Sequence, residues 1–477
     1  MLKHYVHCHK AYDFNKGGSV GYISSLYKAF KDFNPNFTSK AGIKHHFLFP
    51  NIEVNKTLKN DLLKNVIDHR FTYTQNYTEA ATQKLLLPRK RWFREIVNEA
   101  QWNEIDKDLS SIHIHGAYNF LPIYNSLVRT GVESRVIKIL TTHNPYQPTM
   151  EDMYLTCRTI KWLDCDKKMF HYYFNERDKW AFTLADCLFF PSEESLEGYY
   201  NLWDDFKNLI KNKPIYFCPT GTKSKDLVQD KEHLRKELNI PKNAKIFLYL
   251  GRFIDVRGYD ILIEAAKILI NSNKNVYFLV VGENAQAGIE SSQWIQIPYT
   301  QNPQDYIHLA DACLCPNRGS LFDLSMIEIL SLKKPLICSF VGGYKWLEGR
   351  TKGMIYAKPN SIESFVKAMN EFLALNEEQI KQMCEDNFNL YQKELTLESF
   401  EQNYCKTIDK IYEDFGVSKK MYQLSFCEKT INFPLDDTPL QDDYTLSKWQ
   451  RKLMKLQKNP KAFFRDFIAK KIKGKIN

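Results

Sequence analysis

The 477-residue sequence contains little that would carry it into or across a membrane. No apolar run reaches the ~18 residues that suggest a membrane-spanning helix. The first residues, MLKHYVHCHKAYDF, lack the apolar core and the small-residue cleavage site of a secretory signal. Both absences predict a protein of the cytoplasm.

Paired cysteines are absent as well. The eleven cysteines are scattered, mostly among apolar residues, as in ADCLFF around Cys187, and no CxxC pair occurs. Cys313 and Cys315 would share one face of a strand, but no further ligands stand at a spacing that suits a metal site. We therefore expect reduced thiols in the protein core and no bound metal ion.

Most of the chain has no excess of either charge. Ser447–Asn477 holds eleven basic residues and a single acidic one, whereas the rest of the chain holds 55 basic and 55 acidic residues. The whole formal net charge of +10 therefore lies in this segment, the basic tail 447–477. A neutral body with one cationic end indicates a localised anionic partner.

The basic tail 447–477 has the pattern of two short amphipathic helices. Asn459 and Pro460 suit the cap and the first position of the second helix. The lysines lie opposite an apolar side made of Trp449, Leu453, Leu456, Phe463, Phe464, Phe467, Ile468 and Ile472. Such helices lie in lipid interfaces, so we expect this tail to hold the protein at the inner face of the cytoplasmic membrane. A helix packed on the body is the alternative, and nucleic acid is not expected because basic–aromatic patches are missing elsewhere.

Short apolar runs alternate with helix-period segments, which predicts α/β units with parallel sheets. A polar stretch at 220–243 marks a boundary, so we expect domains at 1–222 and 223–416 and a linker at 417–446. A helical insertion is expected at about 60–107, and a helix over 259–270. The expected strands are IHIHG, VIKILTTH, CLFFPS, KIFLYLG, NVYFLVVG, WIQIP, ACLCP and PLICSF.

Three segments carry groups suited to phosphate or ribose. Gly17 and Gly18 lie at a strand-to-helix turn, where backbone N–H groups can approach a phosphate, although many such turns are only turns. Arg252 and Arg257 follow the KIFLYLG strand, at the sheet edge where open α/β folds bind anions; solvated loop arginines are the alternative. Glu328 stands among apolar helix residues, and either ribose hydroxyls or a neighbouring lysine would satisfy it.

Together these segments resemble the large family 4 of retaining glycosyltransferases. The similarity rests on the glycine turn, on LGRFIDVRG in place of the family's GR…KG, and on SLFDLSMIE in place of its E-x7-E block. VYFLVVGEN, SFVGGYKWLEG and KGMIYAKPNS extend it over roughly residues 1–415. The resemblance implies the GT-B fold, two Rossmann-like domains with parallel sheets facing across a cleft, here with a C-terminal helical extension.

The resemblance also assigns roles to residues. Ser320 stands where the family has its first glutamate, which touches the transferred sugar, and Asp323 stands where it has glycine. His113 is expected to be a hydrogen-bonded core residue. The donor-binding residues would be Gly17, Gly18, Arg252, Arg257, Ser320, Asp323, Leu324, Ser325 and Glu328, with Arg252 on the pyrophosphate and Glu328 on the ribose. The catalytic residues would be His143, Arg252 and Arg257, and the acceptor-binding residues His115 and Tyr118.

The implied activity is transfer of a sugar from a UDP- or GDP-sugar to a glycan or lipid-linked acceptor, with retention and without a bound cofactor. The arginines would stabilise the leaving diphosphate in place of a metal, and no DxD-like pair stands at an expected strand end. The leaving phosphate itself can act as the base, so no protein nucleophile is assigned. Synthesis of a bacterial capsule or lipopolysaccharide is the expected setting.

Ser320 leaves a second possibility open. A GT-B protein without the sugar-binding glutamate could be catalytically impaired and serve as a nucleotide-binding partner or scaffold in a polysaccharide assembly complex. A GT-B phosphorylase is disfavoured, because no lysine segment suited to pyridoxal phosphate is apparent.

Overall fold

The computed structural model describes residues 2–8, 11–14, 16–49, 108–158, 164–272, 275–282 and 288–417, with the isolated residues Leu456 and Pro460. The expected helical insertion at about 60–107 lies outside the described residues. The same holds for the linker at 417–446 beyond Val417, and for the basic tail 447–477 beyond the two isolated residues. Within the described part, no helix is long and apolar enough to cross a membrane.

The first domain is built on a six-stranded parallel sheet in the order β2-β1-β3-β4-β5-β6. Helices cover both of its faces, so the inner strands are buried almost throughout, including the histidines of KHYVH and SIHIH. The strands are β1 (Lys3–His7), β2 (Lys44–Leu48), β3 (Ser111–His115), β4 (Ile137–Thr141), β5 (Cys187–Phe190) and β6 (Ile215–Phe217). The helices are α1 (Gly18–Phe33), α5 (Ala117–Thr130), α6 (Pro148–Arg158), α7 (Asp164–Leu184), α8 (Glu197–Leu202) and α9 (Phe206–Ile210), with the short η2 (Glu194–Leu196).

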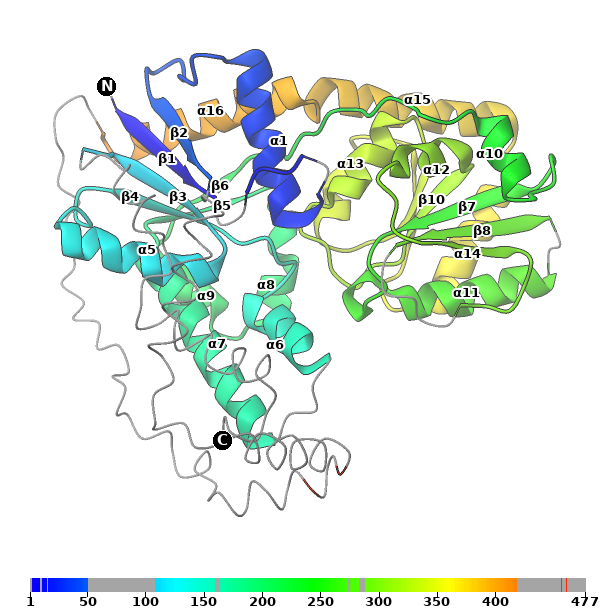
Figure 1. The fold of residues 1–477 in the computed structure, drawn as a ribbon, viewed down its shortest axis with the longest axis horizontal. Coiled ribbons are helices and arrows are strands. Elements are labelled where there is room, and N and C mark those ends of the chain that lie inside the picture. Colours follow the sequence, from blue (N-terminus) through cyan, green and yellow to red (C-terminus); the bar gives the residue numbers. More distant parts are fainter. Residues whose placement is uncertain are drawn as a thin grey trace, which may run out of the picture.

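The second domain repeats the plan with the order β12-β11-β10-β7-β8-β9, again entirely parallel. In Figure 1 the two domains lie side by side, the first in blue to teal and the second in green to yellow. Its strands are β7 (Lys245–Leu250), β8 (Val276–Val281), β9 (Trp294–Ile297), β10 (Ala312–Cys315), β11 (Leu336–Ser339) and β12 (Met354–Ala357). Its helices are α10 (Lys231–Glu237), α11 (Tyr259–Ser272), α12 (Pro303–Leu309), α13 (Leu324–Ser331), α14 (Ile362–Leu373) and α15 (Glu377–Glu394), with η3 (Asp255–Arg257) and η4 (Gly342–Leu347).

Every strand that the sequence predicted is present, and so is the helix expected over 259–270. The side chains of eight of the eleven cysteines are described; all eight are free, and seven of them are buried. Burial raises the pKa of these thiols, in Cys315 to about 12. The expectation of core thiols is therefore confirmed for the seven buried cysteines, none of which forms a disulfide.

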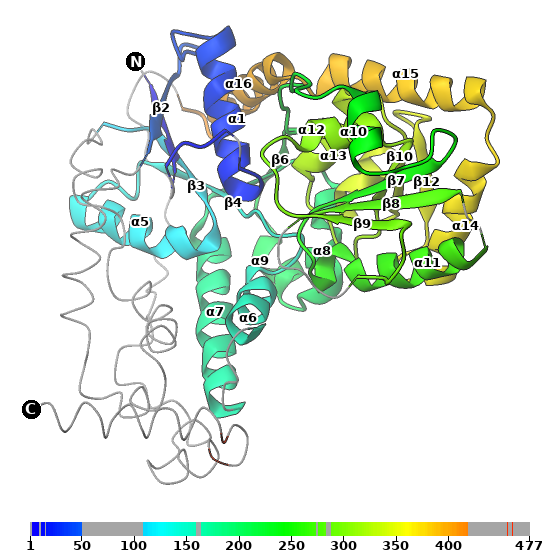
Figure 2. The same cartoon turned by 45° about the vertical axis from the view of Figure 1, so that its right-hand side comes forward.

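One boundary needs correction. The last helix, α16 (Leu397–Asp414), was expected in the second domain, but it packs on α1 and the sheet of the first (Figures 1 and 2). Its side chains at i, i+4, i+8 and i+11 form a buried stripe, Phe400, Tyr404, Ile408 and Ile411, within the core of the first domain. Nothing in the amphipathic pattern itself says which domain such a stripe will cover.

Candidate active site

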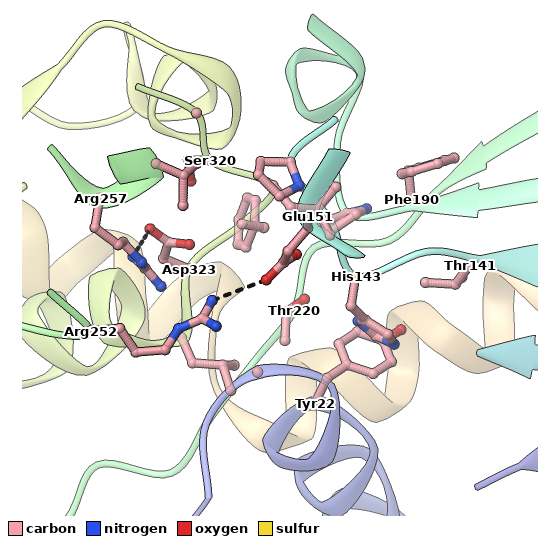
Figure 3. A pocket seen from close by; sticks show the side chains of 18 of the residues that line it. Tyr22, Thr141, His143, Glu151, Phe190, Thr220, Arg252, Arg257, Ser320 and Asp323 are labelled. Atoms are coloured by element: carbon pink, nitrogen blue, oxygen red, sulfur yellow. Dashed lines mark hydrogen bonds and ion pairs between the residues drawn. The ribbon is translucent and has the colours of Figure 1, made fainter. Parts of the chain in front are cut away.

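A cleft lies between the two domains, at the carboxyl ends of strands from both sheets. It holds about 830 Å³ of space, part of it open to solvent. Figure 3 shows side chains from both domains pointing into it. It is lined by Gly18, Tyr22, Thr141, His143, Pro145, Glu151, Phe189, Phe190, Pro191 and Thr220, and from the second domain by Arg252, Val256, Arg257, Gly319, Ser320, Leu321, Phe322, Asp323 and Leu324.

Arg252 extends into the cleft from the loop after β7 and bridges the two domains. Its Nη2 lies 3.3 Å from Oε1 of Glu151 on α6. A dashed line in Figure 3 marks this contact. The other carboxylate oxygen of Glu151 accepts a hydrogen bond of 2.6 Å from Nδ2 of Asn144. Because the Arg252 side chain is 51% exposed, this ion pair is open to solvent and to any anion that enters the cleft.

Arg257, at the end of η3, makes a tighter pair within the second domain. Its Nη1 lies 2.5 Å from Oδ2 of Asp323, and the same oxygen accepts hydrogen bonds from Asn317 Nδ2 at 3.0 Å and the Tyr344 hydroxyl at 2.7 Å. Burial disfavours the charge of the guanidinium, but Asp323, together with smaller contributions from Tyr344 and Tyr249, raises the pKa of Arg257 overall. Arg257 is thus always charged, and the negative charge of Asp323 offsets much of its positive charge within the protein.

The amino end of α1 reaches the same cleft. Gly17 caps the helix in an extended conformation and Gly18 has a φ of +63°, which favours glycine. A Cβ on Gly21 would lie 2.8 Å from Cδ1 of Leu324, so glycine there lets α1 approach the start of α13 closely. The positive end of a helix dipole therefore lies near the two arginines.

His143 follows β4 and lines the cleft as predicted. Its Nε2 lies 3.1 Å from Nδ1 of His115, and the two rings stack with centroids 5.2 Å apart. Burial lowers the pKa of His143 to about 4, so the ring is neutral at pH 7. A neutral imidazole can donate or accept a hydrogen bond but contributes no net charge to the cleft.

Neither of the two predicted acceptor-binding residues lines this cleft, and their acceptor role stays a prediction. His115 is fully buried behind His143. Tyr118 packs over Gly116, where a Cβ would lie only 2.7 Å from the Tyr118 ring. His113 is the expected core residue: its ring nitrogens bond the Tyr404 hydroxyl at 2.8 Å and Thr141 Oγ1 at 2.7 Å.

Glu328 does not line the cleft either. Its carboxylate forms an ion pair with Lys225 at 3.1 Å, the alternative partner that the sequence left open. Lys225 and Glu328 line a separate small hollow with Gln304 on α12. Gly17 and Ser325 also lie outside the cleft lining, although each adjoins a residue that lines it.

Sequence reasoning missed several lining residues, notably Glu151, Tyr22, Thr141 and Thr220. Glu151 is in the first turn of α6, where a carboxylate is ordinary helix chemistry and gives no sign of a site. Only the packing of the second domain against the first places Arg252 beside it. Thr141 could have been predicted from the sequence, because it lies at the end of the expected strand VIKILTTH, two residues before His143.

Residues 230–387 match the family model "Glycosyl transferases group 1". This segment is a group 1 glycosyltransferase domain. It contains Arg252, Arg257, Ser320 and Asp323, which make up much of the second domain's side of the cleft.

Curated relatives match parts of the chain at moderate identity. The candidate teichuronic acid biosynthesis glycosyltransferase TuaC of Bacillus subtilis is 30% identical over 147 residues, which are 30% of this chain and 37% of that protein. The lipopolysaccharide 1,2-N-acetylglucosaminetransferase of Salmonella typhimurium is 28% identical over 202 residues, 38% of this chain and 53% of that protein. The chain thus spans about half the length of these relatives or less.

Solved structures match the whole two-domain arrangement. Sucrose-phosphate synthase from Thermosynechococcus elongatus superimposes with a TM-score of 0.57 at 16% identity, over 87% of this chain and 100% of that one. Anabaena Alr3699/HepE, solved in complex with UDP-glucose, gives a TM-score of 0.53 at 11% identity, over 86% of this chain and 100% of that one. At these identities the likeness shows the fold, and the predicted GT-B architecture is confirmed.

Proposed function

We propose that this protein transfers a sugar from a nucleotide-sugar donor to a glycan or lipid-linked acceptor. One observation carries the proposal: in a chain with a group 1 glycosyltransferase domain, Arg252, Arg257 and the amino end of α1 converge on one interdomain cleft. Guanidinium groups and helix amino ends are suited to a diphosphate. The donor would be a UDP- or GDP-sugar whose diphosphate lies against these groups.

The chemistry follows from that placement. As the bond between the sugar and the diphosphate breaks, negative charge grows on the leaving phosphate, and Arg252, Arg257 and backbone N–H groups of α1 stabilise it. Neutral His143 offers a hydrogen bond to the sugar from the opposite side of the cleft. Transfer proceeds with retention, because the leaving phosphate accepts the acceptor's proton on the face from which it departs.

The setting is proposed to be synthesis of a bacterial capsule or lipopolysaccharide. The names of the relatives from Bacillus subtilis and Salmonella typhimurium refer to teichuronic acid and to lipopolysaccharide, which supports a surface glycan as acceptor. A lipid-linked acceptor would also suit a protein held on the inner face of the cytoplasmic membrane by the basic tail 447–477.

A second function has its own support. Ser320 brings a neutral hydroxyl where the family has a sugar-binding glutamate, and Asp323 balances the charge of Arg257. Both changes fit a GT-B protein that binds a nucleotide and acts as a scaffold without turnover.

A donor screen separates the two functions. The purified protein is mixed with a panel of UDP- and GDP-sugars without acceptor, and release of the nucleoside diphosphate and binding are both measured. We expect at least one donor to bind and to be slowly hydrolysed. Binding of nucleotides without turnover of any donor, also in the presence of lipid-linked acceptors, would favour the scaffold.

A further inference from the structure

Two carboxylates, those of Asp323 and Glu151, line the cleft, and they differ in how strongly the protein binds them. Asp323 receives three hydrogen bonds on one oxygen, from Arg257, Asn317 and Tyr344, and its side chain is 12% exposed. Releasing it would leave Arg257 without its partner in a partly buried place, which is costly. Asp323 is therefore committed to the protein and is not available for a ligand.

Glu151 is held by its arginine much less firmly than Asp323 is, although its other carboxylate oxygen keeps the hydrogen bond of 2.6 Å from Asn144. Its contact with Arg252 is a single one, 3.3 Å long, and the arginine is half exposed. Ion pairs of this kind contribute little, at most about 1 kcal/mol. A diphosphate, which can grip a guanidinium bidentately, would displace Glu151 from Arg252.

The backbone beneath Glu151 is, in contrast, anchored. Both the backbone N–H and the hydroxyl of Thr149 donate to Asp178 Oδ2 at 2.7 Å. Arg177, fully buried, bonds Asp178 and also Asp152 Oδ2 at 2.6 Å. The first turn of α6 is thus fixed on one side of Glu151 by the hydrogen bonds of Thr149 to buried Asp178, and on the other by the ion pair of Asp152 with buried Arg177. The carboxylate of Glu151 therefore stays in the cleft when Arg252 leaves it.

The second domain contributes the hydroxyl of Ser320 to the lining of the cleft. Ser320 Oγ lines the cleft, the residue is 2% exposed, and the atom has no hydrogen-bond partner among the described residues. A buried hydroxyl without a hydrogen-bond partner is unusual, because no hydrogen bond offsets the free energy lost when water is removed from it. It is a natural contact for a sugar hydroxyl, but unlike a carboxylate it cannot supply negative charge.

We infer that Glu151 of the first domain supplies the carboxylate for the transferred sugar, in place of the glutamate that Ser320 replaces. Glu151 competes with the donor's diphosphate for Arg252; once the diphosphate has taken Arg252, Glu151 accepts hydrogen bonds from hydroxyls of the sugar. This inference rests on the proposed function and deepens it, because it assigns sugar recognition to a residue outside the group 1 domain.

The test measures recognition of the diphosphate and recognition of the sugar separately. UDP and GDP probe the diphosphate site alone, and the nucleotide sugar that the donor screen identifies probes both. In Glu151→Gln, we expect the affinity for the nucleoside diphosphate to rise by up to about 5-fold, because a competing charge is lost. Turnover of the nucleotide sugar is expected to fall by about 10-fold or more, because a charged hydrogen-bond acceptor is lost.

A matched control addresses the domain contact. Glu197 of α8 also pairs across the domains, with Lys345 and the Gly342 N–H, but it does not line the cleft. Glu197→Gln should leave both the affinity for the nucleoside diphosphate and the turnover of the nucleotide sugar unchanged. Glu151→Asp keeps the negative charge but shortens the side chain by one carbon, so it should lower turnover less than Glu151→Gln does. It also serves as a second variant if Glu151→Gln is unstable.

The outcomes are distinct. A wild-type protein that binds no nucleoside diphosphate and turns over no donor overturns the proposed function itself. A wild-type protein that does both, with Glu151→Gln unchanged in both measurements, overturns only the role of Glu151. Equal effects of Glu151→Gln and Glu197→Gln would also overturn it, because Glu151 would then act merely as a link between the domains.

Discussion

Arg257 and Asp323 form an ion pair of 2.5 Å on the second domain's wall of the cleft, and both side chains are largely shielded from solvent. In the family that the sequence resembles, the position of Asp323 is a glycine and that of Arg257 a lysine. The two departures from the family pattern are therefore partners. An arginine at this place keeps its charge next to a carboxylate that also fixes Asn317 and Tyr344.

The pair should contribute to stability. Asp323→Asn leaves Arg257 without its counter-charge, so we expect the free energy of unfolding to fall by about 2–4 kcal/mol. Thermal or urea unfolding monitored by circular dichroism measures this. Asp255→Asn is the control, because Asp255 pairs with Arg318 while 70% exposed and should have little effect. Equal stability of the two variants would contradict the account of Asp323.

The buried histidines of the first domain should make stability depend on pH. Burial lowers the pKa of His143 and His7 to about 4 and that of His45 and His113 to about 3, well below 6.5. The unfolded chain therefore binds more protons than the folded one between pH 6.5 and about 4. Stability should be complete above pH 7 and should fall steadily as the pH drops through this window.

Melting temperatures between pH 4.5 and 8 test this dependence. His113→Asn, which removes one of the titrating groups, should make the curve shallower even though it lowers stability at pH 7. A melting temperature that stays constant from pH 7 to pH 5 would show that these rings are accessible to protons in the folded protein.

Chelators should leave transfer intact. Arginines occupy the place where a diphosphate would lie, and no DxD-like acid pair follows an expected strand in the sequence. Turnover measured in the presence of EDTA should equal turnover without it. Loss of activity in EDTA and its recovery with Mn²⁺ would contradict the proposed stabilisation of the leaving group.

The basic tail 447–477 remains a prediction from the sequence alone. Deleting Ser447–Asn477 should release the protein from anionic liposomes and preserve transfer to a soluble acceptor analogue, because the remaining chain has no net charge. Binding of the intact protein should weaken with salt, and also when Phe463, Phe464 and Phe467 are replaced by serine. If the shortened protein unfolds instead, the tail is a structural helix of the body.

Local sequence patterns were sufficient to predict most of the strands and several of the site residues. The apolar runs that became strands, the helix at 259–270 and the placement of Arg252 at a strand end follow from periodicity and from the rule that sites lie at the carboxyl ends of parallel strands. His143 follows from the same rule. These features depend on neighbours in sequence, which a single chain displays directly.

The parts that were missed depend on residues distant in sequence. Glu151 becomes a cleft residue only because Arg252, about a hundred positions later, is brought against it. His115 ends a strand just as a site residue would, yet His143 and Tyr22 cover it. The apolar stripe of α16 was visible, but its main partner, α1, lies almost four hundred residues upstream.

The most direct test of the central claim measures donor binding at Arg252. Calorimetry with the donor that the screen identifies, or with its nucleoside diphosphate, is carried out on the wild type, on Arg252→Ala and on Arg350→Ala. Arg350 is a control from the same domain, paired with Glu394 outside the cleft. We predict that Arg252→Ala weakens binding by about 10-fold or more, as expected for the loss of a charge-assisted contact, while Arg350→Ala binds like the wild type. Unchanged affinity in Arg252→Ala would contradict a donor site in this cleft.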